Sequence, residues 1–550
     1  MAPIIMQYLN TGNIAETVFR FAEERGDQTA LVIPREWDDQ GVLSDDRITF
    51  REFATRTRRY MAGLRAQGLQ PGDRAVVLFP LCIDLYVCIA ALYACGVTAV
   101  LIDPGMGAKR IKWSLQTVQA RAILSVNAFL KYRWLLRPLC RIPMKFSQDK
   151  CGFGVRPFST LLGDPEESGD LITRASDDEA LITFTSGSTG KPKGANRTHG
   201  HLKSQQRALM STFPPFEGQI DMTCLPVVAF HNLSCGVTTI MPAVDIANPA
   251  SVEPRAVVSQ IREWGVASLT SAPAFMQKLT GFLVASNESI PGMKLVGVGG
   301  APVSKELAAT MLQAFPEAKG FAVYGSTEAE PMAHAHLEDV VRKTSDGFLG
   351  GEVAEVAELA LVTLPTRSPT LDAQGLAPYR VPEGGIGEVL VRGPHVNRGY
   401  INNPEANLEN KVIEEDGSVW HRTGDLGYFD QDDHLWLVGR VKDRVSHGEG
   451  FVDPYPVESA LEAQAQISRA AVMACSKSPF AIIVLQADEE SSQASLASAC
   501  EVLTQRGLTD VQCVTIEKLP VDGRHNSKVD RPTLRAMLDK QWPLRNDRLR

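Results

Sequence analysis

Residues 184–194 read FTSGSTGKPKG and bring together three kinds of group that bind phosphate. The glycines let backbone amides crowd together, the hydroxyl side chains can donate hydrogen bonds, and Lys191 and Lys193 add positive charge. The run follows the apolar segment 180–184, which is typical of a strand. We therefore predict a polyphosphate-binding loop with these members: Thr185, Ser186, Gly187, Ser188, Thr189, Gly190 and Lys193.

Two better-known phosphate-binding patterns do not fit. A Walker A loop has Gly-Lys-Ser/Thr opening a helix, whereas Pro192 follows Lys191 here. The glycines at 297, 299 and 300 could begin a dinucleotide fingerprint, but Pro302 stands at the third glycine position. The alternative in which residues 184–194 bind no ligand is a flexible Ser/Gly linker, but a linker would not need two lysines, a proline and an adjacent strand.

Five other short segments carry groups that could act together with this loop. Taken alone, each is an ordinary loop or turn sequence. In chain order they are Gly299-Gly-Ala-Pro302, Tyr324-Gly-Ser-Thr-Glu328, Arg422-Thr-Gly-Asp425, Gly439-Arg-Val-Lys442 and Arg524-His-Asn-Ser-Lys528. With residues 184–194, and over nearly the whole chain, they resemble the superfamily of acyl- and aryl-CoA ligases, peptide-synthetase adenylation domains and luciferases.

The resemblance implies an enzyme that uses ATP and Mg²⁺ to convert a carboxylic acid into an acyl-adenylate. A carboxylate such as Glu328 suits a magnesium ion that bridges phosphates. An ammonium such as Lys528 relieves the repulsion between an attacking carboxylate and a phosphate. The roles that the resemblance implies are catalysis for Lys528, Glu328, Thr189 and Lys193; phosphate binding for Thr327; adenine or ribose binding for Gly300, Ala301, Pro302, Tyr324, Gly325, Ser326, Asp425 and Arg440; and a hinge at Arg440 and Lys442.

Two histidine patterns are weaker signals. His231 lies in LPVVAFHNLSCG, which resembles the family segment whose aromatic or histidine side chain gates the acyl pocket. A core or capping histidine is nearly as good an interpretation. His334 and His336 form a His-x-His pair, but no third ligand stands nearby in the sequence, so we do not predict a metal site there.

The stretch after the hinge bears on the second half-reaction. It reads VSHGEGFVDPYPVE, where typical ligases carry a glycine-centred loop for the thiol step, and this weighs against coenzyme A. LIDPGMG, YGSTEAEP, VWHRTGDLGY, PYPVE and RHNSK resemble the β-lactone synthetases of bacterial olefin biosynthesis. That resemblance implies a long-chain 2-alkyl-3-hydroxy acid whose own hydroxyl attacks the acyl carbon, although Glu330 stands where that subgroup has leucine. The alternatives are a fatty acyl-CoA ligase and a non-catalytic nucleotide- or lipid-binding relative.

The elements that must position these residues alternate between β-rich and helical runs from residue 75 to 324. This alternation predicts parallel sheets wrapped by helices. After residue 346, short strands with Gly and Pro between them predict a small antiparallel or barrel-like unit. Beyond residue 440 an α+β tail begins, with strands near 470–474 and 481–486 and a last helix from Arg531. We predict an α/β protein with an N-terminal AMP-binding domain, 1–439, and a small mobile C-terminal domain, 440–550.

Composition indicates a globular enzyme and argues against nucleic acid as a partner. The chain has 550 residues, 44% of them hydrophobic, and a formal net charge of −8, so it does not attract phosphate backbones as a whole. Ten cysteines without a CxxC pair or a secretory leader favour reduced thiols in the cytoplasm. The expected partners are ATP and a carboxylic (fatty) acid, with other pathway enzymes as a further alternative.

Two segments raise the question of a membrane. The nearly uncharged run 85–102 approaches the length of a spanning helix, but a buried helix from Ile83 to about Cys95 followed by a strand explains it better. Residues 129–146 interleave five basic residues with Trp134 and leucines, a pattern that suits a helix resting on a lipid surface. A basic solvated face over a core is the more favoured interpretation, and peripheral membrane contact stays an alternative.

Overall fold

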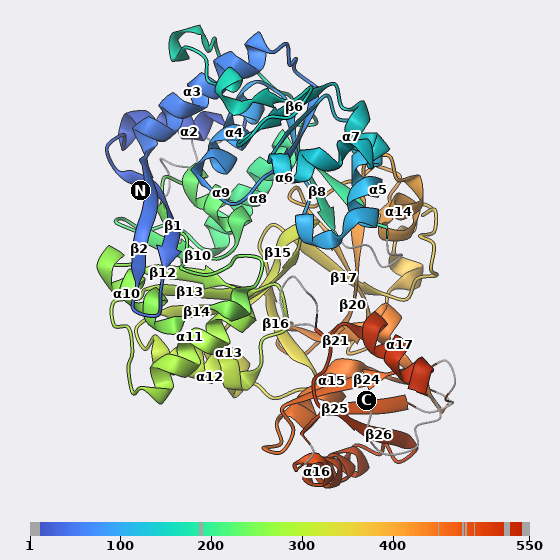
Figure 1. Cartoon of the computed structure of the whole chain (residues 1–550). Helices are drawn as coiled ribbons and strands as arrows, with labels where there is room; N and C mark the ends of the chain where they lie inside the picture. The colour runs from blue at the N-terminus through green and yellow to red at the C-terminus, as the bar shows by residue number, and fades with distance from the viewer. Residues whose placement is uncertain are drawn as a thin grey trace.

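The computed structural model describes residues 12–185, 191–448, 450–475, 478, 481–488, 490–521 and 529–541. The predicted loop residues 186–190 and Lys528 lie outside these ranges. Figure 1 shows two sheet-based layers formed by the first two thirds of the chain and a smaller C-terminal part, coloured orange and red, at the lower right.

A seven-stranded sheet forms the first layer. Its order is β7-β6-β5-β3-β4-β8-β9, and every pairing is parallel except that of β8 with β9. Its strands are β3 (Arg74–Leu78), β4 (Thr98–Leu101), β5 (Ala122–Ser125), β6 (Met144–Ser147), β7 (Arg156–Pro157), β8 (Glu179–Thr185) and β9 (Lys193–Thr198). Its helices and short 3-10 turns are α2 (Glu16–Glu24), α3 (Phe50–Ala66), α4 (Ile83–Ala94), η1 (Pro104–Met106), α5 (Ala108–Val118), α6 (Asn127–Leu130), η2 (Lys131–Trp134), α7 (Arg137–Arg141), η3 (Phe158–Leu161) and η4 (Pro165–Glu167).

The second layer is a mainly parallel sheet with an N-terminal hairpin at one edge and the antiparallel strand β15, paired with β14, at the other. Strand β1 pairs with β11 in parallel, so the hairpin β1–β2 extends the sheet. The strands are β1 (Thr29–Trp37), β2 (Val42–Thr49), β10 (Ile220–Thr223), β11 (Thr238–Ile240), β12 (Ser268–Ser271), β13 (Leu295–Gly299), β14 (Lys319–Ser326) and β15 (Ala329–His336). Its helices are α8 (His199–Thr212), α9 (Pro226–Ser234), η5 (Pro249–Ser251), α10 (Pro254–Trp264), α11 (Pro273–Ala285), α12 (Lys305–Ala314) and α13 (Leu337–Arg342).

The predicted antiparallel unit is present and is hydrogen-bonded to the second sheet. Strand β16 (Phe348–Val353) pairs with β15 on one side and with β21 on the other, so the two sheets form one path. The other elements of this unit are β17 (Glu358–Val362), η6 (Ala377–Tyr379), β18 (Gly387–Arg392), α14 (Pro404–Asn410), β19 (Lys411–Ile413), β20 (Val419–Phe429) and β21 (Leu435–Arg440).

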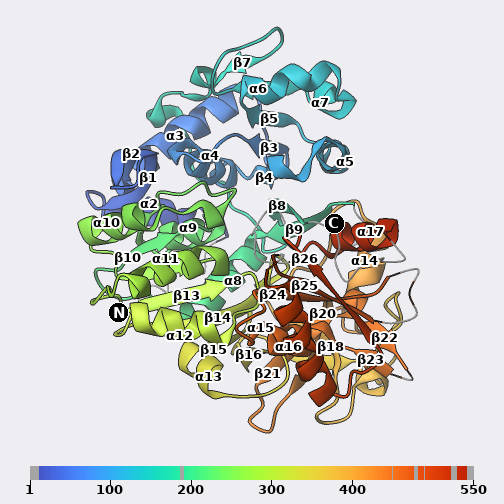
Figure 2. The ribbon, with the colours of Figure 1, turned by 60° about the horizontal axis from the view of Figure 1, so that its bottom comes forward.

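The C-terminal part has its own three-stranded sheet and its own apolar clusters, formed by residues from Val445 onward. Its elements are η7 (Val441–Asp443), β22 (Val445–His447), β23 (Gly450–Val452), α15 (Pro454–Glu462), β24 (Arg469–Met473), β25 (Ala481–Gln486), α16 (Ser492–Gln505), β26 (Val511–Ile516) and α17 (Arg531–Gln541). Figures 1 and 2 both show α15 beside β21, and α15 contacts β21 and β16. Contact with the rest of the chain includes Tyr455, whose ring lies 5.3 Å from that of Phe348, and an ion pair of 2.9 Å between Arg506 and Asp346.

The two segments that raised a membrane question have different outcomes. Residues 83–101 form the buried helix α4 and then β4, as predicted, and no helix in the described part of the chain is long and apolar enough to cross a membrane. Residues 129–146 do not form one continuous helix, so the less favoured interpretation of this segment as a single helix resting on a lipid surface was wrong. They divide into α6, η2, α7 and β6, because Pro138 can stand only in the first turn of α7 and Pro143 directly precedes β6. Arg133 and Lys145 are buried and donate to the backbone carbonyls of Leu130 and Ile142.

The predicted fold class is confirmed: a large sheet-rich N-terminal part and a small α+β C-terminal part. Hydrophobic burial explains the alternation, since the strands of both parallel sheets are covered by helices on their faces.

Asp221 on β10 provides a test of this core. Its carboxylate accepts hydrogen bonds from Ser268 (2.5 Å) and Asn232 (2.7 Å), and burial raises its pKa to about 7. Between about pH 4 and pH 7 the unfolded chain has lost this proton while the folded chain keeps it, so stability falls by about 1.4 kcal/mol per pH unit as pH rises. Asp221→Asn removes this titration. The melting temperature of the variant relative to wild type is therefore expected to rise between pH 4 and pH 7.

The exposed Asp177 supplies the control. Thermal unfolding of Asp177→Asn should follow wild type at every pH. A pH-independent difference between Asp221→Asn and wild type would contradict the assignment of a buried, protonated carboxyl.

Candidate active site

Adjacent parallel strands bring two of the predicted segments to one edge of the second sheet. Gly299 on β13 pairs with Val323 on β14, so Gly300 and Tyr324 follow at the same level. Gly300 has φ +87°, a conformation that side chains disfavour, and a Cβ added there would meet nothing within 4 Å. This edge, outside the carboxyl ends of parallel strands, is where α/β sheets bind ligands.

A tyrosine, an aspartate and an arginine from three strands meet at this edge. Tyr324 donates its hydroxyl to Asp425 on β20 at 2.8 Å, and Arg440 on β21 pairs with the other carboxylate oxygen at 2.8 Å. Burial, together with the negative charge of Asp425, holds the pKa of Tyr324 well above its ordinary value. The Asp425 carboxylate raises the pKa of Arg440. The structure therefore brings together three residues that the sequence assigned to the adenine, ribose and hinge regions.

Strand β20 is held in place by a buried ion pair. Arg422 contacts both carboxylate oxygens of Glu388 on β18, the shorter distance being 2.7 Å, and both side chains are 7% exposed. Arg422 also donates to the carbonyls of Pro365 and Thr366. These bonds fix the strand that carries Asp425.

Glu328 occupies the turn between β14 and β15 and is buried. Its carboxylate accepts a hydrogen bond of 2.9 Å from the hydroxyl of Tyr400, and its backbone carbonyl accepts one of 2.6 Å from the amide of Asn397. Burial alone would raise the pKa of Glu328, but the neighbouring His421 and Lys411, the hydrogen bond from Tyr400 and the charge of Arg197 hold it below its ordinary value. The group is thus an anionic oxygen ligand kept ionised in a buried place.

Lys193 lies near the ring of Tyr400. Its ammonium is 5.6 Å from the centre of the Tyr400 ring and donates to the side chain of Asn410 at 2.9 Å. Burial lowers the pKa of Lys193. Thr185 pairs with Lys193 across β8 and β9.

Three residues of the site were not found from the sequence. Lys411 at the start of β19 is buried, donates to the carbonyl of Asn397, and lies 5.3 Å from the centre of the Tyr400 ring. Burial lowers the pKa of Lys411 to about 7. Arg197 on β9 is also buried and donates to the carbonyl of Thr327 at 2.6 Å. Tyr400 follows Gly399 in a loop whose sequence gives no chemical signal.

The remaining predicted residues have different positions. Ser326, Gly325 and Thr327 lie in or next to the β14–β15 turn, and Ala301 and Pro302 follow Gly300. Lys442 is exposed in η7, directly after Arg440. His231 is half-buried on α9, where its ring nitrogen is 3.7 Å from the sulfur of Cys235 and burial lowers its pKa to about 4. Among the described residues it has no hydrogen bond to Tyr324, Glu328 or Asp425.

The histidine pair is part of an aromatic cluster. The ring centre of Phe321 is 5.9 Å from that of His334 and 4.6 Å from that of His336. Both imidazole rings therefore pack against Phe321.

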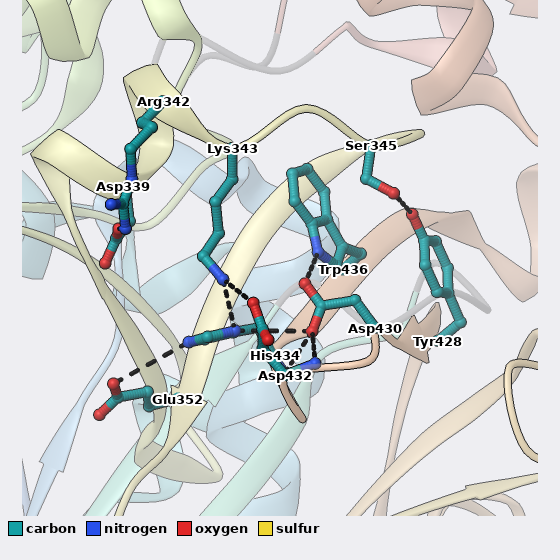
Figure 3. A network of polar contacts seen from close by, with 10 residues as sticks. All are labelled: Asp339, Arg342, Lys343, Ser345, Glu352, Tyr428, Asp430, Asp432, His434 and Trp436. Carbon is teal, nitrogen blue, oxygen red and sulfur yellow. Dashed lines mark hydrogen bonds and ion pairs between the residues drawn. The ribbon is translucent and has the colours of Figure 1, made fainter.

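A group of acidic residues and a histidine in the β20–β21 turn also has the composition of a cation site. Figure 3 shows that Lys343 fills it: its ammonium lies 2.7 Å from a carboxylate oxygen of Asp432 and 3.0 Å from Nδ1 of His434. Asp430 accepts from the backbone amide of His434 and from the indole of Trp436. The cluster therefore stabilises a hairpin turn, and a lysine already supplies its positive charge.

Taken together, the site offers one buried carboxylate, several buried cations, and a carboxylate–arginine pair beside an exposed glycine turn. The cations can neutralise a polyanion, Glu328 can hold a hard divalent metal ion, and Asp425 can accept hydrogen bonds from sugar hydroxyls. This set of groups is suited to a nucleoside triphosphate bound with a metal ion.

Comparison with known proteins supports a nucleotide-binding site. Residues 18–401 match the family described as AMP-binding enzyme. An olefin beta-lactone synthetase of Xanthomonas campestris pv. campestris is 29% identical over 95% of this chain and 96% of its own length. A 4-coumarate–CoA ligase of Oryza sativa subsp. japonica is 27% identical over 82% of this chain and 80% of its own. The solved structure of o-succinylbenzoate coenzyme A synthetase from Bacillus subtilis, in complex with ATP and magnesium, has a TM-score of 0.72 at 21% identity and covers 94% of this chain and 98% of that one.

The buried Arg422–Glu388 pair gives a prediction about stability. Arg422→Met leaves the Glu388 charge buried without its partner, which is expected to cost about 3–5 kcal/mol and to lower the urea midpoint. Adding Glu388→Leu to this variant should restore part of the loss. The exposed neighbour Arg367, changed to Met, is the control and should change stability by less than about 0.5 kcal/mol. Equal midpoints for Arg422→Met and Arg367→Met would contradict this role.

Proposed function

Because the chain belongs to the family of AMP-binding enzymes and is an adenylate-forming ligase, we propose that it activates a long-chain 2-alkyl-3-hydroxy acid with ATP and closes it to a β-lactone. The observation that carries the adenylation step is the convergence of Lys193, Glu328 and the Asp425–Arg440 pair from four separate strands and turns.

We assign nucleotide binding to the edge formed by β13, β14, β20 and β21. Gly300, Ala301 and Pro302 would lie against adenine, and Asp425 would accept from the ribose hydroxyls. Residues 185–190, Lys193 and Thr327 would surround the phosphates. Glu328 fits a magnesium ion, because it is a buried carboxylate held ionised by its surroundings; when bound, the ion would neutralise phosphate charge.

In the first step, a carboxylate oxygen of the acid attacks the α-phosphorus of ATP. A C(O)O–P bond forms, the α–β phosphoanhydride bond breaks, and pyrophosphate leaves. Because two anions must approach each other, positive charge beside them lowers the free-energy barrier of this step. Lys193 provides charge from β9, and Lys528 is proposed to bring a second ammonium from the C-terminal part.

In the second step, the 3-hydroxyl oxygen of the same molecule attacks the acyl carbon. A ring C–O bond forms, the acyl–phosphate bond breaks, AMP leaves, and the hydroxyl proton passes to solvent. Holding the hydroxyl next to the acyl carbon replaces a second substrate by a high effective molarity. The site therefore does not need a channel for a thiol.

Two observations support this second step over thioester formation. The similarity to the Xanthomonas synthetase extends over nearly the whole chain, including the C-terminal part. The segment after Arg440 also reads VSHGEGFVDPYPVE, which differs from the glycine-centred loop that the resemblance implies for a ligase. In the structure Gly448 has φ +56° in the β22–β23 turn, and Phe451 is 60% exposed. A fatty acyl-CoA ligase is the second candidate, because the similarity to the 4-coumarate–CoA ligase covers most of both chains.

We further propose that the chain divides near residue 440 into domains 1–439 and 440–550, with a hinge at Arg440 and Lys442. Gly439 suits such a joint: a Cβ there would lie 2.7 Å from Cδ of Pro454, so only glycine allows this approach. His231 is proposed to border the acyl pocket, since α9 begins after β10 at the same edge of the sheet.

The adenylation roles are tested by exchange of pyrophosphate into ATP. Glu328→Gln and Lys528→Ala each remove charge that is needed in the transition state, so each should lower exchange by about 10²–10³-fold. The exposed residues Glu383 and Lys518 provide the controls Glu383→Gln and Lys518→Ala, which should keep wild-type exchange. Wild-type exchange by Lys528→Ala would remove Lys528 from the mechanism.

The acceptor is tested by the product formed from a 2-alkyl-3-hydroxy acid, ATP and Mg²⁺. We expect a β-lactone and AMP in equal amounts, without dependence on coenzyme A, as measured by mass spectrometry and AMP release. A thioester that forms only when coenzyme A is added would favour the ligase instead. No AMP and no pyrophosphate from any acid in a broad panel would favour a non-catalytic relative.

A further inference from the structure

An exposed apolar tip surrounded by cations lies at the outer edge of the seven-stranded sheet. It is formed by residues 127–154, which include α6, η2, α7 and β6 and the loop after β6. Figures 1 and 2 both show α7 at the end of the molecule away from the β24–β26 sheet. The mechanism proposed above does not use this surface.

The tip gathers large apolar side chains that are unusually exposed. Of the thirteen exposed large hydrophobic side chains among the described residues, four lie here: Tyr132 (47%), Trp134 (66%), Leu135 (79%) and Phe153 (87%). Arg133 joins the two parts of the tip, since it donates to the carbonyl of Phe153 at 2.8 Å and its guanidinium lies 5.0 Å from the Trp134 ring. Water contact with such a patch is unfavourable, so its exposure indicates a docking function.

The charge of the tip is opposite to that of the chain. Residues 127–154 contain six basic residues and one acidic residue, whereas the chain has a net charge of −8. Arg133 and Lys145 are buried and bond to backbone carbonyls, so they shape the tip. The exposed cations are Lys131, Arg137, Arg141 and Lys150.

The neighbouring helix α5 extends this positive surface. It contacts α7 and exposes Lys109, Arg110 and Lys112, and it contains no acidic residue. The carboxylate of Asp149, the acid within the tip, accepts hydrogen bonds from the amide of Asn127 and the hydroxyl of Ser147. The cations thus surround the apolar side chains with little opposing charge.

From this combination we infer that the tip docks onto the surface of an anionic phospholipid membrane. Aromatic and leucine side chains enter the boundary between headgroups and acyl chains, while lysine and arginine bind the anionic headgroups. An RNA could stack on the exposed aromatic rings, but it would gain nothing from Leu135, the most exposed aliphatic side chain of the tip, whereas a lipid surface uses both. Membrane contact also fits a substrate with long alkyl chains, although the inference rests on the surface alone.

Sedimentation of the full-length chain with vesicles tests this inference. Wild type should sediment with vesicles of phosphatidylcholine and phosphatidylglycerol, much less with phosphatidylcholine alone, and less as salt is raised. Trp134→Ser with Leu135→Ser should lower the partition coefficient by about tenfold or more. Arg137→Glu with Lys150→Glu should lower it similarly, and both sites are exposed enough for the fold to be kept.

Matched controls exist on other surfaces of the chain. Trp37→Ser with Leu43→Ser removes the same residue types from the β1–β2 hairpin, and Lys278→Glu with Lys319→Glu makes the same charge change over the second sheet. Both should bind vesicles like wild type. A blue shift of tryptophan emission on anionic vesicles should be seen for wild type and lost in the Trp134 variant.

Three outcomes would overturn the inference. Wild type could stay in the supernatant with anionic vesicles, or the controls could lose as much binding as the tip variants. The tip variants could also change the self-association of the chain without vesicles, which would indicate a contact between copies. Pyrophosphate exchange with a short soluble acid should be unchanged in all tip variants, so failure here is separate from failure of the proposed function.

Discussion

The constraint on which the site depends is the burial of one carboxylate. Glu328 can stay ionised inside the protein only if positive charge and a hydrogen bond surround it, and these come from segments far apart in the chain. Lys193 and Arg197 come from β9, Tyr400 from the loop before α14, and Lys411 from β19. The antiparallel unit must therefore join the parallel sheet at β15–β16, since a separate unit could not bring Tyr400 and Lys411 to the β14–β15 turn.

The Asp425–Arg440 pair imposes a second constraint. One oxygen of Asp425 is bonded to Tyr324 in the second sheet, and the other to the last residue of β21, directly before the C-terminal part. A ligand that competes for either oxygen would act on the joint between the two parts. The groups proposed to bind ribose are thus also those that tie the C-terminal part to the sheet.

Much of the fold could be predicted because the spacing of hydrophobic residues reflects which face of an element is buried, and Gly and Pro mark the turns between elements. The strand 481–486 and the start of the last helix at Arg531 agree with the predicted bounds. Roles could be proposed for Tyr324, Asp425 and Arg440 because each lies in a short segment that resembles a family motif. Lys411 could not, since a lysine at a strand start looks solvated until its burial beside Tyr400 is known. Likewise, the alternation of charged and apolar residues in 129–146 does not reveal that Arg133 and Lys145 are buried.

Tyr455 of α15 packs against the apolar cluster around Leu435 and Leu437, on which Tyr324 also lies. Any swing of the C-terminal part about Arg440 must withdraw this ring into water. Burial of apolar surface is driven by entropy near room temperature and weakens on cooling. If the C-terminal part turns about the hinge proposed above, the balance between its orientations should therefore shift with temperature, with the undocked arrangement more populated in a cold sample than in a warm one.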